Sequence, residues 1–268
     1  MGFEHRKGTM ENLDIKDNWN RMADEYELFT DHEESYSNLI EWKAIKTILP
    51  ELKNKSIVDL GCGTGRFSFL FESMNPRSIT GIDLSEKMIE IGLNNAKRKK
   101  SIVKFVHGNI EDLSDMKLEN IDFVFSSTTL HYIKNLNNIM QQINRILTSG
   151  GECILSVIHP VYSAYYPILH ENRELPDDDE WTIRYLDSRD RGYVQPWIEY
   201  NPNVNNFLSF SYHHTMGDYI NSIIRAGFQI KELLEPLPPK SWLGNNPERY
   251  YGFINTPTYA IFKIEKVI

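Results

Sequence analysis

The stretch Val58-Asp-Leu-Gly-Cys-Gly-Thr-Gly-Arg-Phe-Ser68 (VDLGCGTGRFS) decides how the rest of the chain is interpreted. Its glycines, Gly61, Gly63 and Gly65, alternate between a short apolar run and a helix-like pattern. Glycines at such a turn let the backbone approach a nucleotide closely. The spacing is G-x-G-x-G, whereas the dinucleotide fingerprint is G-x-G-x-x-G. Asp59 would repel a pyrophosphate but attract an ammonium or sulfonium ion, so the stretch favours a positively charged nucleoside.

Short β-rich runs alternate with helix-length segments on both sides of this stretch. Such alternation is typical of βαβ units in a parallel sheet. The helical segments include 85–98 and 136–147. The predicted strands are Ser56–Leu60, Ser78–Asp83, Val103–His107, Ile121–Ser126 and Gly151–Val157.

The two ends of the chain complete the pattern. Residues 12–49 have helical periodicity, with Trp19, Met22, Ala23 and Tyr26 on one face. Near the C-terminus a predicted helix (215–226) precedes a strand (229–235), a proline-marked loop and a strand (258–266). These last two strands are predicted to form a hairpin-like antiparallel pair.

Composition limits the kind of partner. A net charge of -8 argues against a surface that follows nucleic-acid phosphates. No apolar stretch approaches the length of a membrane span, and Cys62 and Cys153 give neither a disulfide framework nor a metal spacing. We therefore expect a cytoplasmic protein with a small-molecule partner, no nucleic acid, no membrane association and no metal. The oligomeric state stays open.

Residues 160–213 lack clear periodicity but are rich in aromatic residues. A long irregular segment inside a compact domain is usually functional, and the aromatic content argues against disorder. We expect an aromatic lid over a bound small molecule, with a satellite core or a dimer contact as the alternatives. The side chains predicted to contact that molecule are Tyr162, Tyr165, Trp181, Trp197 and His214.

Five segments in order resemble the class I S-adenosylmethionine (SAM)-dependent methyltransferases, and the resemblance covers nearly the whole chain. The first is the glycine stretch, and the second is ITGIDLSEKMIEI (79–91). The others are FVHGNIEDL (105–113), IDFVFSSTTLHYI (121–133) and LTSGGECILSVIHP (147–160). SYHHTMGDY (211–219) further resembles a bacterial subgroup of small-molecule methyltransferases. His214 stands where that subgroup has Arg, so a clamp for an anionic substrate is in doubt.

The resemblance implies an α/β, Rossmann-like fold with a seven-stranded, mostly parallel sheet, helices on both faces and a lid insertion. It divides the chain into an N-terminal helical segment over the cofactor (1–50), a SAM-binding core (51–159), the aromatic insertion (160–213) and the C-terminal part of the same core (214–268).

The same resemblance implies a binding site for SAM and its product S-adenosylhomocysteine. Asp83 would bind the ribose hydroxyls, Asp59 would favour the ammonium group, and Tyr26 would close over the cofactor. Asp83 could instead cap the following helix, and Asn109 could be a turn former. The full predicted set is Tyr26, Asp59, Gly61, Cys62, Gly63, Asp83, Leu84, Met88, Asn109, Ile110 and Ser126.

The implied reaction is in-line methyl transfer to a small organic acceptor, with O-, N- or C-methylation undetermined. Positioning should be the main catalytic effect. Three histidines are predicted to face the acceptor as wall residues or as bases: His131, His159 and His213. An NAD(P)-linked oxidoreductase and a non-catalytic SAM-binding protein are the alternatives.

Overall fold

The computed structural model describes residues 14–30, 35–166, 183–194 and 208–267. A seven-stranded sheet forms its centre, in the order β3-β2-β1-β4-β5-β9-β8. Strands β1 to β5 run parallel, and β9 is antiparallel to both β5 and β8. The predicted fold class and the C-terminal antiparallel pair are therefore confirmed. The strands are β1 (Ser56–Leu60), β2 (Ser78–Asp83), β3 (Lys104–His107), β4 (Ile121–Ser127), β5 (Leu147–Ile158), β8 (Phe228–Leu234) and β9 (Tyr259–Lys266).

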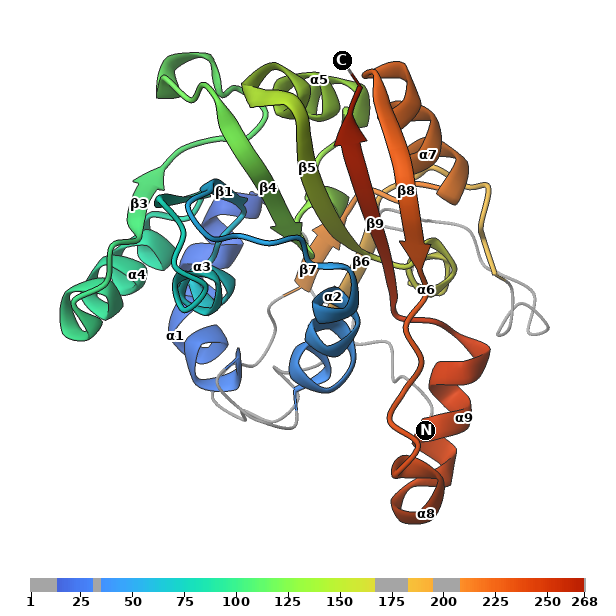
Figure 1. Cartoon of the computed structure of the whole chain (residues 1–268). Coiled ribbons are helices and arrows are strands. Elements are labelled where there is room, and N and C mark those ends of the chain that lie inside the picture. Colours follow the sequence, from blue (N-terminus) through green and yellow to red (C-terminus); the bar gives the residue numbers. More distant parts are fainter. Residues whose placement is uncertain (1–13, 31–34, 167–182, 195–207, 268) are drawn as a thin grey trace.

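Helices cover both faces of this sheet (Figure 1). They are α1 (Ile15–Thr30), α2 (Trp42–Ile48), α3 (Arg66–Glu72), α4 (Glu86–Lys99), α5 (Leu136–Ile146), α6 (Pro160–Ala164), α7 (Met216–Arg225), α8 (Trp242–Asn245) and α9 (Pro247–Asn255). Single turns supplement them: the π-helix η1 (Ser37–Glu41) and the 3-10 helices η2 (Ser114–Met116) and η3 (Leu130–Tyr132).

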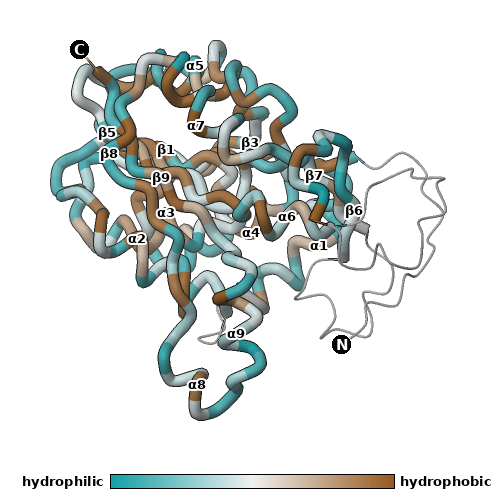
Figure 2. The backbone as a smooth tube through the Cα atoms, turned by 90° about the vertical axis from the view of Figure 1, so that its right-hand side faces the viewer, coloured by the Kyte–Doolittle hydropathy of each residue, from teal (hydrophilic) through white to brown (hydrophobic). Residues whose placement is uncertain are grey.

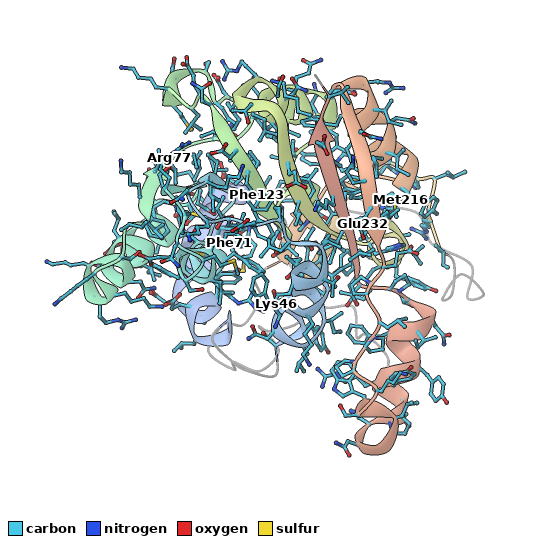
Figure 3. All side chains as sticks on the ribbon, viewed as in Figure 1. Lys46, Phe71, Arg77, Phe123, Met216 and Glu232 are labelled. Carbon is cyan, nitrogen blue, oxygen red and sulfur yellow. The ribbon has the colours of Figure 1, made fainter. Side chains whose placement is uncertain are left out.

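Side-chain alternation along the strands creates two cores. In β4, Phe123 and Phe125 belong to the core that also contains Phe71 of α3, and the rings of Phe71 and Phe123 lie 6.0 Å apart (Figure 3). Val124 belongs to the opposite core, with Ile143 of α5 and residues of α7. The carboxyl ends of β1 to β5 thus meet at one edge of a sheet that is buried on both faces.

Two segments differ from the sequence prediction. The stretch between β8 and β9 was predicted as a loop, but it contains α8 and α9. The Asn246 side chain accepts a hydrogen bond from the Arg249 N–H (3.0 Å), and Pro247 occupies the first turn, so the Asn-Pro pair starts a helix rather than a turn. Helix α9 projects beyond the sheet (Figure 1).

The segment 160–213 was expected to be irregular, yet parts of it are ordered as secondary structure. Strands β6 (Arg191–Val194) and β7 (Leu208–Ser211) form a separate antiparallel pair, in which Arg191 is opposite Ser211. This pair lies on the side of the molecule where α1 and α6 are found (Figure 2). Four-residue strands this far apart in sequence give no periodic signal.

Candidate active site

The glycine loop joins β1 to α3, and its three glycines have positive φ angles of 71°, 55° and 93°. A Cβ atom on Gly61 would lie 2.1 Å from Thr129 Oγ1, and one on Gly65 would lie 2.3 Å from Phe105 Cζ. Packing within the protein therefore requires glycine at these two positions. At Gly63 the nearest group is the Tyr26 ring, 3.3 Å from an added Cβ.

Asp83 connects the ends of β1 and β2. One carboxylate oxygen accepts a hydrogen bond from the Gly63 N–H and the other accepts one from the Ser85 N–H, both at 2.8 Å. Burial raises the pKa of Asp83, while these backbone hydrogen bonds oppose that shift. Ser85 itself caps α4 by accepting from the Met88 N–H (3.1 Å), so Asp83 is not the helix cap. Leu84 is partly buried and Met88 is buried beside this carboxylate.

Three predicted cofactor residues support the loop from inside. The Ser68 hydroxyl donates to Asp59 (2.6 Å), and burial raises the pKa of Asp59 to about 7. The Ser126 hydroxyl donates to the Leu60 carbonyl (2.9 Å), which immediately precedes Gly61. Cys62 is buried, and burial raises the pKa of its thiol. The loop is thus held by hydrogen bonds from β4 and α3.

Asn109 forms a turn after β3. Its side-chain oxygen accepts a hydrogen bond from the Glu111 N–H (2.9 Å), and its carbonyl accepts one from the Asp112 N–H (3.1 Å). The alternative role that the sequence offered, a turn former, is therefore present in the structure. An amide oxygen has a second lone pair, so a ligand amino group could still bind there. Ile110 is buried beside it.

Tyr26 brings α1 over the glycine loop. Its ring approaches Gly63, and it packs edge-to-face on Trp19 with the ring centroids 5.5 Å apart. Burial raises the pKa of the Tyr26 hydroxyl. Helix α1 therefore packs against the glycine loop through Tyr26, and its place over a bound cofactor stays a prediction.

His131 lies at the end of β4 with neither ring nitrogen hydrogen-bonded within the described chain. The residue is buried, and burial lowers its pKa to about 3, with a contribution from nearby His214. Its ring contacts that of Tyr132, with centroids 4.1 Å apart. His131 is therefore a neutral imidazole with both nitrogens available to a ligand.

The other two proposed catalytic histidines are engaged in structural contacts. His159 Nδ1 accepts from the Val161 N–H (3.1 Å) as the cap of α6, and its Nε2 donates to Glu235 (2.7 Å). His213 hydrogen-bonds the Ser163 hydroxyl (2.9 Å) and the Tyr185 carbonyl (2.8 Å). Both nitrogens of each ring are hydrogen-bonded, and these contacts hold α6 and the 183–194 segment in place; a catalytic role for His159 and His213 stays a prediction.

His214 was expected to contact the acceptor. Its Nε2 donates to the Ile133 carbonyl (2.8 Å), and its ring packs against Tyr219 of α7 with centroids 5.5 Å apart. It therefore connects the segment after β4 to α7.

Tyrosines from distant parts of the chain form a cluster, the tyrosine cluster, that consists of Tyr132, Tyr162, Tyr166 and Tyr193. The Tyr132 and Tyr193 hydroxyls lie 3.0 Å apart. Tyr166 stacks on Tyr193 at 4.2 Å and meets Tyr162 edge-to-face at 5.5 Å. Tyr165 instead is 45% exposed, and Trp181 and Trp197 lie outside the described residues.

The sequence analysis missed Glu41, a carboxylate with no exposed surface. It ends η1, where it accepts hydrogen bonds from the Ser127 hydroxyl (2.5 Å) and the Ser37 hydroxyl. A signal was available, since Glu41 precedes the buried Ile45 and Ile48 by four and seven residues. It therefore occupies the apolar face of its helix, where a charge is unusual.

Two kinds of site have no support among the residues that the structure describes. They contain no group of three or more His, Cys, Asp or Glu side chains arranged to hold a metal ion. Within the same ranges, no helix has the length and apolar character needed to cross a membrane.

Comparison with known proteins gives a consistent result. Residues 51–200 match a family described as a methyltransferase domain. An uncharacterized protein of Haemophilus influenzae is 30% identical over 87% of this chain and 89% of its own length. A solved SAM-dependent methyltransferase from Mesorhizobium loti is 27% identical with a TM-score of 0.66, over 84% of this chain and 97% of its own. A demethylmenaquinone methyltransferase from Leptospira interrogans is 27% identical over 56% of this chain, which spans only 62% of that enzyme.

Proposed function

The chain belongs to the class I SAM-dependent methyltransferases, and on that premise we propose that it methylates a small organic acceptor bound at the carboxyl ends of β4 and β5 and the start of β9. The observation that carries this proposal is the pairing of a loop held by Asp83 at one half of the sheet edge with the tyrosine cluster and His131 at the other. The net charge of -8 favours a small acceptor over a nucleic acid.

The residues at β1 and β2 fit SAM. We assign the ribose hydroxyls to the Asp83 carboxylate, and the methionine part to the backbone of Gly61 and Gly63 under the Tyr26 ring. Asp59, once ionised, favours the ammonium group. The adenine ring is assigned to the space between Leu84, Met88 and the turn at Asn109 and Ile110. When bound, SAM supplies a methyl group that is already activated toward displacement.

The chain's main contribution to the reaction is alignment. Holding two reactants in place is worth roughly 7–11 kcal/mol, whereas a general base adds about 10²–10⁴-fold in rate. Of the three histidines first considered, only His131 keeps free ring nitrogens. A neutral imidazole can donate to the acceptor from one nitrogen and accept from the other. We therefore assign to His131 the orientation of the acceptor. His159 and His213 are assigned to holding α6 and the 183–194 segment in place beside it.

The segment 160–213 covers the acceptor in this proposal. Tyr162 lies within α6 and Tyr165 follows its last residue, directly after β5, where we place the entry of the acceptor. Tyr193 and Tyr166 pack tightly enough to serve as a fixed wall, as the satellite-core alternative also requires. Excluding water from the two reactants is the function assigned to this wall.

Thermal unfolding with added nucleotides tests the cofactor assignment. Saturation with S-adenosylhomocysteine at a hundredfold excess over its Kd should add about 2.7 kcal/mol of apparent stability. NAD should add nothing, because the loop lacks the dinucleotide spacing. Equal stabilisation by NAD would support the oxidoreductase alternative. Methyl transfer from labelled SAM to any member of a small-molecule library would separate the enzyme from a non-catalytic binder.

A further inference from the structure

Glu41 is a buried carboxylate without a cationic partner in the described chain. Its oxygens accept hydrogen bonds from two serine hydroxyls, Ser127 and Ser37. Arg66 approaches it only indirectly, because its guanidinium donates to Ser37 Oγ (2.7 Å) and to the Asn38 side chain (2.5 Å). An ionised carboxylate with no exposed surface is costly unless a positive charge is brought to it. No cation contacts the carboxylate directly among the described residues, and Arg66 is separated from it by the Ser37 hydroxyl, so a ligand cation could still form the direct ion pair.

The strand register places this carboxylate beside the acceptor half of the sheet edge. Ser127 of β4 is paired with Ser156 of β5, which is paired with Ile261 of β9. Two residues further along β5, Ile158 is paired with Tyr259. Side chains two residues apart, and those of paired residues, share a face. Ser127, Ser156 and Tyr259 therefore line the face from which Glu41 approaches.

A second buried polar group on this face also lacks a partner. Ser156 Oγ is fully buried and makes no hydrogen bond. Buried hydroxyls are rarely left unsatisfied, and such exceptions often mark a place where a ligand or water binds. The orphaned hydroxyl lies one strand away from the Ser127 hydroxyl that binds Glu41, so both polar groups belong to one site.

Aromatic rings complete the surroundings of the carboxylate. Tyr259 and Tyr26 are close enough that the charge of Glu41 contributes to raising the pKa of each hydroxyl. Aromatic faces together with one buried carboxylate are the combination that binds organic ammonium groups.

We propose that the methyl acceptor carries a cationic nitrogen and that Glu41, Ser156 and the ring of Tyr259 bind this ammonium head group. The inference rests on the proposed function and specifies its substrate class. SAM is also a cation, but its assigned place is at β1 and β2, where Asp59 and Asp83 lie. Glu41 is hydrogen-bonded directly to the last residue of β4 and lies near the start of β9, whereas its connection to the glycine-loop side runs through Ser37 and Arg66. The bound nitrogen need not be the atom that is methylated.

The test uses the full-length chain saturated with S-adenosylhomocysteine and a matched pair of probes. Choline carries a quaternary ammonium, and 3,3-dimethylbutan-1-ol is its neutral counterpart of the same shape. Isothermal titration calorimetry should give choline an affinity at least about tenfold higher than that of the alcohol. In Glu41→Gln this preference should fall below about twofold, with the affinity for S-adenosylhomocysteine unchanged.

Three further variants make the test specific. Glu51→Gln removes the same charge from an exposed position near the opposite end of β1 and should leave the preference intact. Glu41→Asp keeps the charge and should retain part of the preference. If Glu41→Gln does not fold, Tyr259→Leu should lower the preference about threefold through loss of the ring.

Each remaining outcome decides against one specific claim. Equal affinities for the two probes, no binding of either probe to the S-adenosylhomocysteine complex, or a preference that survives in Glu41→Gln would overturn the ammonium site. A loss of S-adenosylhomocysteine affinity in Glu41→Gln, with the probe preference retained, would assign Glu41 to the cofactor instead. Failure of the unmodified chain to bind S-adenosylhomocysteine would contradict the proposed function itself.

Discussion

The edge of the sheet has two halves that are built differently. At β1 and β2 the proposed cofactor site consists of backbone groups held by short-range contacts, such as the Gly63 N–H on Asp83. At β4, β5 and β9 the proposed acceptor site consists of side chains from distant segments, such as Tyr132 and Tyr193. The first half depends on which residue types can adopt its backbone. The second depends on which side chains the fold happens to bring together.

This difference has a functional meaning. A backbone site binds the same cofactor whatever surrounds it, whereas a side-chain site can change its ligand through single substitutions. We therefore expect substitutions in the first half to affect folding and cofactor affinity together. Substitutions in the second half should leave the cofactor bound.

The largest effect is expected at the glycine loop. Gly61 and Gly150 both have φ of 71°, but an added Cβ meets Thr129 at 2.1 Å in the first case and nothing within 4 Å in the second. Gly150→Ala should lower the free energy of unfolding by about 1–2 kcal/mol, which is the cost of a positive φ for a residue with a Cβ atom. Gly61→Ala adds a steric term, for a total of roughly 3–4 kcal/mol. Urea unfolding measures both, and equal losses would show that contact with Thr129 does not matter.

Asp83→Ala comes next, and its main effect is on ligand affinity. The substitution removes a charged acceptor, so S-adenosylhomocysteine binding should weaken by about 1.5–3 kcal/mol. Calorimetric titration measures this loss, with Asp115→Ala as a control on the exposed η2 turn. An unchanged affinity would show that Asp83 does not bind the ligand and only connects the backbones of Gly63 and Ser85 through its hydrogen bonds.

Asp59 should make the cofactor half sensitive to pH. Burial raises its pKa to about 7 in the folded chain, above the unfolded value, so the folded state binds more protons between these two values. Its stabilising contribution is therefore complete in acid and is lost as the pH rises through about 7. Asp59→Asn should abolish on the order of 2 kcal/mol of the stability difference between acidic and mildly alkaline buffer. Identical pH profiles of unfolding for both proteins would contradict this assignment.

The smallest effect is expected in the acceptor half. A double-mutant cycle of Tyr132→Phe and Tyr193→Phe should give a coupling of about 1 kcal/mol for their hydroxyl pair in urea unfolding. The affinity for S-adenosylhomocysteine should stay within about twofold of the original value, because neither hydroxyl belongs to the loop. Zero coupling between the two hydroxyls would show that their contact does not stabilise the acceptor half. A large loss of S-adenosylhomocysteine affinity would show that the acceptor half and the cofactor half are not independent.

The sequence predicted the sheet well because its strands are locally distinct. Every residue of Ser56–Leu60 is buried, and its apolar residues Ile57, Val58 and Leu60 are typical of a central parallel strand. Helix α9 was missed because Asn246-Pro247 is equally compatible with a turn and with a helix start. The β6–β7 pair was missed because each strand has only four residues, too few for an alternating pattern to be recognised.

The candidate site was easier to predict where its contacts are local. Asp83 and Gly63 lie 20 residues apart, within two consecutive motifs of the family, and the resemblance places both in the proposed cofactor site. His159 was assigned to catalysis because its structural partner, Glu235, lies 76 residues away. Glu41 was overlooked for the same reason, since Ser127 is 86 residues away. Charged residues on helices are usually solvated, so the position of Glu41 on the apolar face of its helix was not interpreted as burial.

Hydrogen–deuterium exchange measured with and without S-adenosylhomocysteine tests the two-halves description most directly. The ligand should slow exchange in peptides that contain residues 59–65 and 83–88. Peptides that contain residues 156–166 and 257–262 should exchange at their original rates. Equal protection of both sets, or protection of the second set alone, would contradict the assignment of the cofactor to β1 and β2.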